Sequence, residues 1–219
     1  DGLVGVSKDT ITDLVETLKI GADIPMRVIL NPINFERVQR LSQAEIDHPW
    51  FQNRDIPVIV TAARLAKQKQ LDGLLRAFAQ VVKVMPARLL ILGEGPLRGE
   101  LESLSQELGV AESVWLPGYD PNPYRYMAAC DVFVLASAWE GCPIALQEAM
   151  ACGAAVVVTD APGGMKDIIE YGKSGVLVAA GDAEALAAGI VQILTQPELK
   201  QHYREKAIER SQAFHYRNT

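Results

Sequence analysis

The sequence predicts an α/β fold with a doubly wound, Rossmann-like parallel sheet, and two observations lead to this prediction. From residue 56 onward, short segments rich in β-branched residues alternate with longer segments of helical periodicity. The short segments are apolar along nearly their whole length, as is typical of strands buried on both faces of a parallel sheet. Their alternation with helices predicts right-handed βαβ units.

The expected elements follow one another without long gaps. Strands are expected at 57–63, 87–93, 113–118, 131–137, 154–160 and 174–180. Helices are expected at 70–84, 96–109, 123–130, 144–153, 164–172 and 182–195, with a terminal amphipathic helix at 197–211. The helix at 70–84 has a continuous apolar stripe, Gly109 suits a helix end, and Asp182 is a candidate N-cap.

The first 55 residues do not follow this alternation. After a strand-like start at 2–7, residues 7–21 predict a helix with Ser7 as its N-cap. The segment 40–55, RLSQAEIDHPWFQNRD, is interpreted as a polar connector. Because the chain begins with Asp1 rather than Met, we expect it to be a piece of a longer protein.

The composition is that of a globular protein and argues against several classes. Of 219 residues, 49% are hydrophobic and 22% are charged, and the net charge of -6 gives no basic surface for nucleic acid. No apolar run approaches the roughly 20 residues of a membrane span, and no secretory signal is visible. Cys130, Cys142 and Cys152 lack the spacing of a zinc site or a disulfide framework.

Candidate binding residues follow the strands, because doubly wound sheets bind ligands at the carboxyl ends of their strands. Arg64, Lys67 and Lys69 follow the first strand, and a turn with Gly93 and Gly95 follows the second. Glycine-rich turns and helix N-termini expose amides that attract anions. Arg64 can grip two phosphate oxygens and Lys69 adds a compact charge, whereas Lys67 is expected to face solvent. The alternative is an ordinary solvated loop.

Two acids stand in the otherwise apolar stretch WEGCPIALQEAMACG, residues 139–153. Glu140 directly follows the fourth strand, and Glu148 lies about one helical turn beyond Ile144 on the same flank of the next helix. An acid in so apolar a helix needs a polar partner, and ribose hydroxyls are a suitable one. The alternatives are a carboxylate that favours the helix dipole or a solvent-exposed face.

A dinucleotide site is disfavoured, although GEGPLRG superficially resembles its glycine pattern. The third glycine comes one position too late for G-x-G-x-x-G, and the motif follows the second strand rather than the first. The first strand-to-helix turn is cationic and lacks glycine. An NAD-dependent oxidoreductase is therefore the less favoured alternative, and a nucleotide-binding module without chemistry remains another.

Together these motifs resemble the donor-binding half of the retaining GT-B glycosyltransferases of family 4, also called glycosyl transferases group 1. EGCPIALQEAMACG resembles the E-x7-E signature of that family, with Glu140 and Glu148 as its two acids. ARLAKQKQLDGLLRAF resembles its basic loop and following helix, and VILNPIN, LLILGEGPLRGELESL and VWLPGY also fit. The resemblance runs from about Val4 to the end of the chain.

The chain departs from the family pattern in three places. The family usually has Gly where Ala63 precedes the basic loop, and Gly where Gln70 follows its lysine. Cys142 and Pro143 stand where an aromatic residue and Gly are frequent. These changes concern the loop geometry, while the charges are intact.

The resemblance implies transfer of a sugar from a UDP- or GDP-sugar to an acceptor hydroxyl, with no cofactor and no metal. Glu140 would contact the transferred sugar, Arg64 and Lys69 the diphosphate, and Glu148 the ribose, and Gly118 and Tyr119 would lie near the base. The implied catalytic residues are Glu140, Arg64 and Lys69, and the implied substrate-binding residues are Glu148, Gly93, Glu94, Gly118, Tyr119, Gly141, Pro143, Ile144 and Ala145.

The family also suggests a division of the chain and a setting. Residues 1–55 would be a remnant of an N-terminal domain with the interdomain connector, 56–196 the nucleotide-sugar domain, and 197–219 a C-terminal helix truncated before a crossover helix. The acceptor, a sugar or lipid-linked glycan, would bind through the missing domain, so the fragment is expected to be weak or inactive in transfer. The location implied is cytoplasmic, and peripheral association of the full-length protein with the inner face of the membrane is compatible with it.

Overall fold

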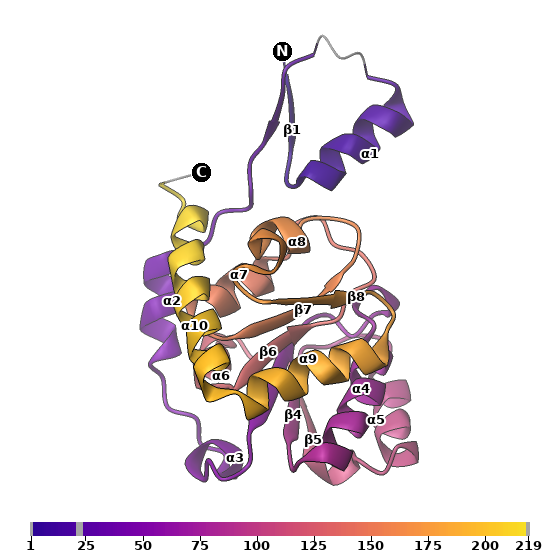
Figure 1. Cartoon of the computed structure of the whole chain (residues 1–219), viewed down its shortest axis with the longest axis vertical. Helices are drawn as coiled ribbons and strands as arrows, with labels where there is room; N and C mark the ends of the chain where they lie inside the picture. Colours follow the sequence, from indigo (N-terminus) through magenta and orange to yellow (C-terminus); the bar gives the residue numbers. More distant parts are fainter. Residues whose placement is uncertain (1, 21–23, 218–219) are drawn as a thin grey trace.

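Six parallel strands form the main sheet of the computed structural model, which describes residues 2–20 and 24–217 (Figure 1). The strand order is β5-β4-β3-β6-β7-β8, so the order reverses between β3 and β6. The strands are β3 (Val58–Ala62), β4 (Arg88–Leu92), β5 (Val114–Gly118), β6 (Val132–Leu135), β7 (Val156–Asp160) and β8 (Val176–Ala179). The predicted doubly wound α/β fold is confirmed, and each strand lies within its expected range.

Helices cover both faces of this sheet (Figure 1). One face packs against α4 (Leu71–Val84), α5 (Arg98–Glu107) and α9 (Ala183–Thr195). The other packs against α2 (Phe35–Ser42), α6 (Tyr124–Ala129), α7 (Ile144–Ala151), α8 (Met165–Ile168) and α10 (Pro197–Ser211). Short 3-10 turns are η1 (Lys67–Lys69), η2 (Ala111–Ser113), η3 (Glu170–Gly172) and η4 (Gln212–Phe214).

Successive residues of each strand enter different cores, which explains the unbroken apolar runs. In β3, Val58 and Val60 belong to the core under α7, whereas Ile59 belongs to the core under α4. All three side chains are fully buried. A polar residue at any of these positions would lose its hydration without gaining a partner, so the strand has no polar face.

The first segment forms a small βαβ unit beyond one end of the sheet (Figure 1). It consists of β1 (Leu3–Gly5), α1 (Lys8–Leu18) and β2 (Met26–Val28), and β1 pairs with β2 in parallel. Ser7 caps α1 as predicted, since its Oγ accepts a hydrogen bond from the N–H of Thr10 at 3.1 Å. Gly21, the last residue of the expected helix, lies outside the described residues.

The interpretation of residues 40–55 as a polar connector is wrong. This segment contains the end of α2 and the helix α3 (Pro49–Gln52), and Trp50 and Phe51 pack against the core. The ring of His48 stacks on Trp115 with 3.7 Å between centroids. The polar residues on either side of these rings, among them Glu45, Asp47, Gln52 and Asn53, are exposed, and they conceal the apolar contacts in the sequence pattern.

Two other predicted helices differ in detail. The helix expected at 164–172 ends at Ile168, because Glu170 and Tyr171 adopt left-handed backbone angles with φ of 51° and 55°. The terminal helix α10 buries only the small residues Ala207 and Ser211, so its apolar face is narrower than expected. After α10 the chain returns to the segment between β2 and α2, where the N–H of Ile33 donates to the carbonyl of Phe214 at 2.9 Å.

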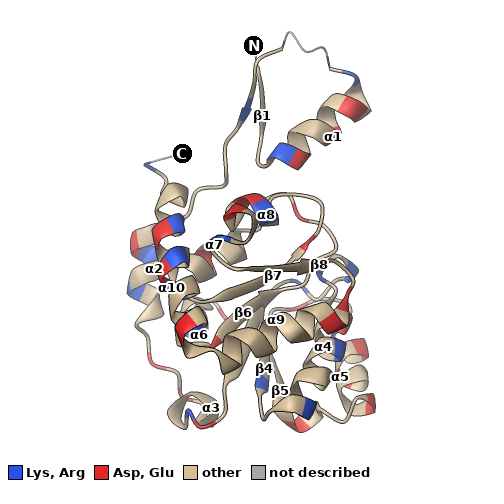
Figure 2. Cartoon of the chain, viewed as in Figure 1, with Lys and Arg blue, Asp and Glu red and all other residues tan. Residues whose placement is uncertain are grey.

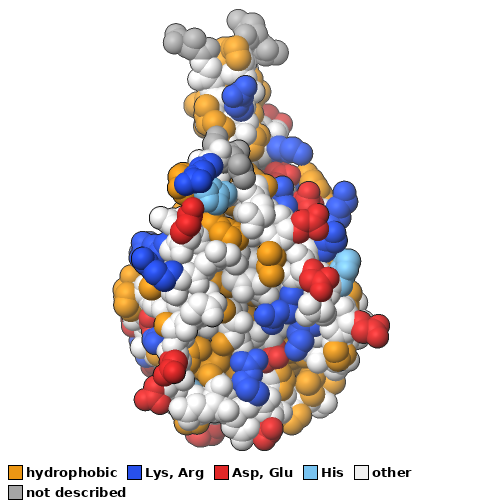
Figure 3. Space-filling model, turned by 90° about the vertical axis from the view of Figure 1, so that its left-hand side faces the viewer, with side chains coloured by type: hydrophobic (Ala, Val, Ile, Leu, Met, Phe, Trp, Pro, Cys, Tyr) orange, Lys and Arg blue, Asp and Glu red, His pale blue; other side chains and the backbone are white. Residues whose placement is uncertain are grey.

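Charge is spread over the helices rather than concentrated on one of them (Figure 2). On the face shown in Figure 3, basic and acidic side chains are interspersed with exposed apolar atoms. Within residues 2–20 and 24–217, no helix has both the length and the apolarity needed to cross a membrane.

Candidate functional site at the carboxyl edge of the sheet

The loops after β3, β4 and β5 are joined by backbone hydrogen bonds at the carboxyl edge of the sheet. The N–H of Leu65 donates to the backbone carbonyl of Glu94, and the N–H of Gly93 donates to the carbonyl of Gly118, each at 2.9 Å. Gly93 has φ of +128°, and a Cβ there would lie 2.0 Å from the carbonyl oxygen of Ala63. The glycine is therefore required by the close approach of two loops as well as by the turn.

A cleft of about 450 Å³ opens beside these loops, within the size range of small-molecule sites. Six of the sequence-predicted residues line it: Arg64, Gly93, Glu94, Tyr119, Ala145 and Glu148. The other lining residues are Ala62, Ala63, Leu92, Asp120, Pro123 and Met127. The cleft thus combines apolar walls with an exposed guanidinium, an exposed phenol and the three carboxylates of Glu94, Asp120 and Glu148.

Glu148 is held at the cleft by a residue that the sequence analysis did not identify. The hydroxyl of Tyr124, on α6, donates to Oε1 of Glu148 at 2.8 Å. Burial raises the pKa of Glu148 above its ordinary value, although the Tyr124 hydroxyl and the Arg37 charge oppose the shift. Burial and the neighbouring carboxylate raise the pKa of Tyr124 to about 12, so the phenol remains a donor.

Glu140 and Lys69 meet at the point where the strand order reverses. The ammonium of Lys69 lies 2.5 Å from Oε1 of Glu140, and the buried Ser137 hydroxyl donates to the same oxygen at 2.6 Å. The Glu140 side chain is only 7% exposed. Gln68 joins the two loops through two hydrogen bonds of 2.8 Å. Its side-chain Nε2 donates to the backbone carbonyl of Trp139, and its backbone carbonyl accepts from the N–H of Ala138.

The backbone of Glu140 is fixed from the other side by the loop after β7. The N–H of Glu140 donates to Pro162 at 3.0 Å, and the N–H of Gly164 donates to Gly141 at 2.9 Å. Between these two bonds lies Gly163, where a Cβ would be placed 1.4 Å from the carbonyl oxygen of Glu140. The loop after β6 is therefore clamped between η1 and the loop after β7.

Helix α7 begins beside this acid and points its N-terminus toward the strand ends. Pro143 precedes Ile144, the first helical residue, and Pro143 caps the helix without a side-chain hydrogen bond. The first amides of a helix have no partner within it, so those of Ile144 and Ala145 can receive an anion. Asn31 supports the loop, because its Nδ2 donates to the carbonyl of Cys142 at 3.0 Å.

The remaining predicted residues do not line the cleft itself. Lys69 lies in η1, Glu140 and Gly141 lie on the loop after β6, and Pro143 and Ile144 lie at the start of α7. Gly118 is buried beside Glu94. Ser137 was missed because a serine at a strand end carries no distinctive signal. Tyr124 was missed because the direction of its hydroxyl depends on how α6 packs against α7.

Gln70 settles one of the departures in the loop. It stands where the resembled family usually has glycine, and its φ of 44° and ψ of 44° are left-handed. The backbone here therefore has a conformation that glycine adopts most readily. Among the residues that the structure describes, no group of three or more His, Cys, Asp or Glu side chains could hold a metal ion.

The family model for glycosyl transferases group 1 matches residues 42–210. The chain is 34% identical, over 95% of its length, to the Campylobacter jejuni protein named N-acetylgalactosamine-N,N'-diacetylbacillosaminyl-diphospho-undecaprenol 4-alpha-N-acetylgalactosaminyltransferase, of which it covers 54%. It is 27% identical, again over 95% of its length, to N-acetyl-alpha-D-glucosaminyl L-malate synthase of Bacillus anthracis, of which it covers 54%. The chain therefore spans about half the length of these curated relatives.

Solved structures share the fold along nearly the whole chain. Sucrose-phosphate synthase from Thermosynechococcus elongatus is 25% identical with a TM-score of 0.82, and the match covers 98% of this chain and 54% of that one. The Anabaena protein HepE, solved in complex with UDP, is 23% identical with a TM-score of 0.83, covering 98% of this chain and 60% of that one.

Proposed function

The chain belongs to the glycosyl transferases group 1 family, and we propose that it is the donor-binding half of a retaining glycosyltransferase. Its α/β fold is one Rossmann-like half of the GT-B architecture. The reaction proposed for the whole protein moves a sugar from a nucleoside diphosphate sugar, UDP- or GDP-linked, to an acceptor hydroxyl, with retention of the anomeric configuration.

The observation that carries the proposal is the order of groups along the carboxyl edge. Tyr119 and Glu148 line the cleft, and Arg64 lies at its wall. Lys69 follows Arg64 in the loop after β3, and it contacts Glu140 on the loop after β6. A nucleotide sugar has the same order of parts: base, ribose, diphosphate, sugar. One extended ligand can therefore contact all five residues.

Each part of the proposed ligand would meet a group of matching chemistry. The Glu148 carboxylate, fixed by Tyr124, would accept hydrogen bonds from the ribose hydroxyls. The base would lie near Gly118 and the exposed ring of Tyr119. Gly93 and Glu94 would form the wall of the nucleotide site.

The leaving diphosphate gains negative charge as its bond to the sugar breaks. Arg64, Lys69 and the first amides of α7 would stabilise this charge, as preorganised donors do in an oxyanion hole. These groups could supply the positive field without a metal ion, and we propose metal-independent transfer. Glu140, anchored through Oε1, would orient the transferred sugar.

The acceptor proposed is a sugar or lipid-linked glycan, bound by the part of the whole protein that faces this half. The name of the Campylobacter jejuni relative includes a diphospho-undecaprenol acceptor, which supports this class. We accordingly propose that the whole protein works in the cytoplasm, where nucleotide sugars are the donors, at the inner face of the membrane.

Calorimetric titration tests the donor assignment on this chain. UDP, GDP, NAD and a panel of UDP- and GDP-sugars are titrated separately. Binding of one nucleoside diphosphate and its sugar derivative, with no binding of NAD, is expected. Preference for NAD, or no binding of any nucleotide, would contradict the proposal. Transfer by the full-length protein, with NMR of the product anomer, then tests retention and separates an enzyme from a nucleotide-binding module.

A further inference from the structure

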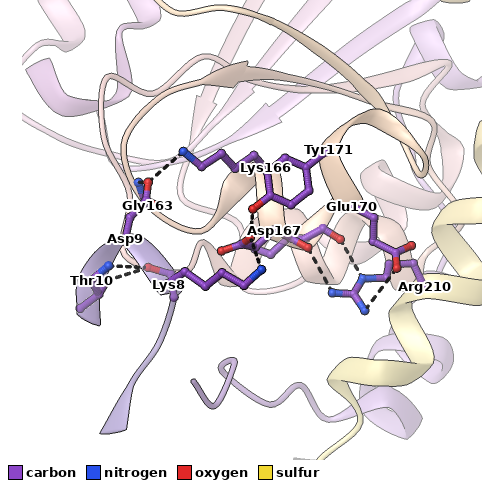
Figure 4. Close-up of polar contacts among 11 residues, drawn as sticks. Lys8, Asp9, Thr10, Gly163, Lys166, Asp167, Glu170, Tyr171 and Arg210 are labelled. Carbon is purple, nitrogen blue, oxygen red and sulfur yellow. Dashed lines mark hydrogen bonds and ion pairs between the residues drawn. The ribbon is translucent and has the colours of Figure 1, made fainter. Parts of the chain in front are cut away.

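The first segment of the chain reaches into the loop that supports Glu140 (Figure 4). Asp9 lies in the first turn of α1, and its Oδ2 accepts a hydrogen bond from the N–H of Gly163 at 2.9 Å. The same oxygen lies 3.1 Å from Nζ of Lys166. Ser7 already caps α1, so the Asp9 side chain is free to serve a segment 154 positions away.

A second contact runs beside the first with its charges reversed. Lys8 lies 3.8 Å from Asp167, so the pair Lys8–Asp9 faces the pair Lys166–Asp167 with complementary signs. The Lys8 side chain is 68% exposed, and solvent screening leaves such a pair little energy. The side chains of Lys166 and Asp9 are 27% and 34% exposed, so solvent reaches their contact less than it reaches Lys8. Of the two contacts, only that of Asp9 also includes a backbone amide.

The loop that Asp9 holds is in contact with Glu140 on both sides. Gly163 has its Cα against the Glu140 carbonyl, so closely that a Cβ would lie 1.4 Å from that oxygen. Pro162 accepts from the N–H of Glu140, and Gly164 donates to Gly141. A shift of the loop by even a fraction of an ångström therefore shifts the Glu140 backbone, because the two segments have no space between them.

From this chain of contacts we infer that Asp9 is a positioning residue for Glu140. By binding the Gly163 amide it fixes the loop after β7, and that loop fixes the backbone from which the Glu140 carboxylate extends. The inference rests on the proposed function, in which Glu140 contacts the transferred sugar. Asp9 itself lies outside residues 42–210, the part matched by the family model.

The ionisation state of Asp9 agrees with this role. Burial alone would raise the pKa of Asp9, but the Gly163 amide and the Lys166 ammonium outweigh it, and the pKa lies below its ordinary value. The carboxylate is therefore charged at neutral pH, when its hydrogen bond to the amide is strongest.

The test compares two affinities in one protein. Calorimetry on the full chain measures a nucleoside diphosphate and the matching nucleotide sugar, for example UDP and UDP-glucose or GDP and GDP-mannose, whichever pair binds the wild type. Asp9→Ala should leave the affinity for the diphosphate within about twofold. It should weaken binding of the nucleotide sugar by about threefold to tenfold, because only the sugar contacts Glu140.

Four further variants separate positioning from general destabilisation. Lys8→Met and Asp13→Ala, both on the surface of α1, should leave both affinities unchanged. Asp9→Asn, which keeps an acceptor for the Gly163 amide, should lose less sugar affinity than Asp9→Ala. The charge swap Asp9→Lys with Lys166→Asp restores an ion pair but leaves the amide without an acceptor, so it should resemble Asp9→Ala.

The outcomes distinguish this inference from the proposed function. If the wild type binds no nucleotide, both are overturned. If it binds and discriminates the two ligands, but Asp9→Ala changes both affinities equally, only the positioning role of Asp9 is overturned. Recovery of the sugar affinity by the charge swap would also overturn it, since the ion pair rather than the amide would then be responsible. Melting temperatures of all variants confirm that folded protein is compared.

Discussion

The ammonium of Lys69 and the carboxylate of Glu140 lie 2.5 Å apart, although the two groups are proposed to contact different parts of one ligand. Lys69 is in η1, after β3, and Glu140 follows β6, the neighbouring strand in the sheet. Their contact bridges the point at which the strand order reverses. The two opposite charges offset each other, so a diphosphate bound to Lys69 would compete with Glu140 for the ammonium.

The first prediction concerns the two cations proposed to bind the diphosphate. Arg64→Ala combined with Lys69→Ala should weaken UDP or GDP binding at least about a hundredfold, because two charge-assisted contacts are lost. Lys67→Ala is the matched control from the same loop, and Lys67 is exposed. Calorimetry decides the matter: equal affinities in the double variant and the wild type would rule out the phosphate assignment.

The second prediction concerns Glu148, whose raised pKa has a definite consequence for stability. The folded protein binds this proton more tightly than the unfolded chain, so the free energy of unfolding falls as pH rises from 4.5 through the raised value. Glu148→Gln removes this contribution, and the variant should gain stability relative to wild type across that window. Urea denaturation at several pH values measures the difference.

The same variant should bind nucleotide less well, since a neutral amide accepts the ribose hydroxyls less strongly than a carboxylate. Glu100→Gln, an exposed change on α5, serves as the control. A large loss of stability in Glu148→Gln at neutral pH, with nucleotide affinity intact, would assign Glu148 a structural role instead.

The third prediction isolates the steric requirement at Gly163. Gly163 and Gly172 both have positive φ, of +114° and +96°, but only Gly163 lies against another backbone. Gly172→Ala should cost about 1–2 kcal/mol for its left-handed conformation. Gly163→Ala should cost about 1–3 kcal/mol more, because its methyl group would overlap the Glu140 carbonyl. Equal losses in denaturant melts would show that the loop moves aside freely.

The fourth prediction concerns the aromatic cluster around α3. Burial, followed by the charge of Arg88, lowers the pKa of His48 below its ordinary value of 6.5. The unfolded chain therefore binds a proton at His48 more readily than the folded protein does. The contribution of neutral His48 to the free energy of unfolding is fully present above pH 6.5 and is lost as pH falls below that value.

His48→Asn keeps an N-cap acceptor for α3 but has no ionisable ring. The free energy of unfolding of this variant should therefore fall less than that of the wild type as pH is lowered. Tryptophan fluorescence during denaturant unfolding measures the difference. His202→Gln, at an exposed position on α10, should follow the wild-type curve. Parallel curves for His48→Asn and wild type would exclude His48 as the source of the acid sensitivity.

The fold was accessible to sequence reasoning because its strands have no polar face. The apolar run from Val58 to Val60 reflects burial in two cores, and few structures other than a covered parallel sheet produce such a run. The connector was misread for the opposite reason. His48 stacks on Trp115 and Trp50 meets Trp115 edge-on, each across more than 60 positions, and a local pattern does not show such pairing.

The charged residues of the candidate site could be predicted from the sequence, but the residues that hold them in position could not. Arg64, Lys69, Glu140 and Glu148 could be placed because strand ends meet at one edge of the sheet. The hydroxyls of Ser137 and Tyr124 and the carboxylate of Asp9 could not, since their roles depend on side-chain direction and on packing between distant elements.

Gln70 gives the loop that carries Lys69 an unusual mechanical property. A side chain with a Cβ pays roughly 1–2 kcal/mol to remain left-handed, and here that residue directly follows the lysine. That cost is met by the elements on either side of Gln70, which is both the C-cap of η1 and the N-cap of α4. The turn that carries Lys69 therefore keeps its shape only while η1 and α4 are both formed.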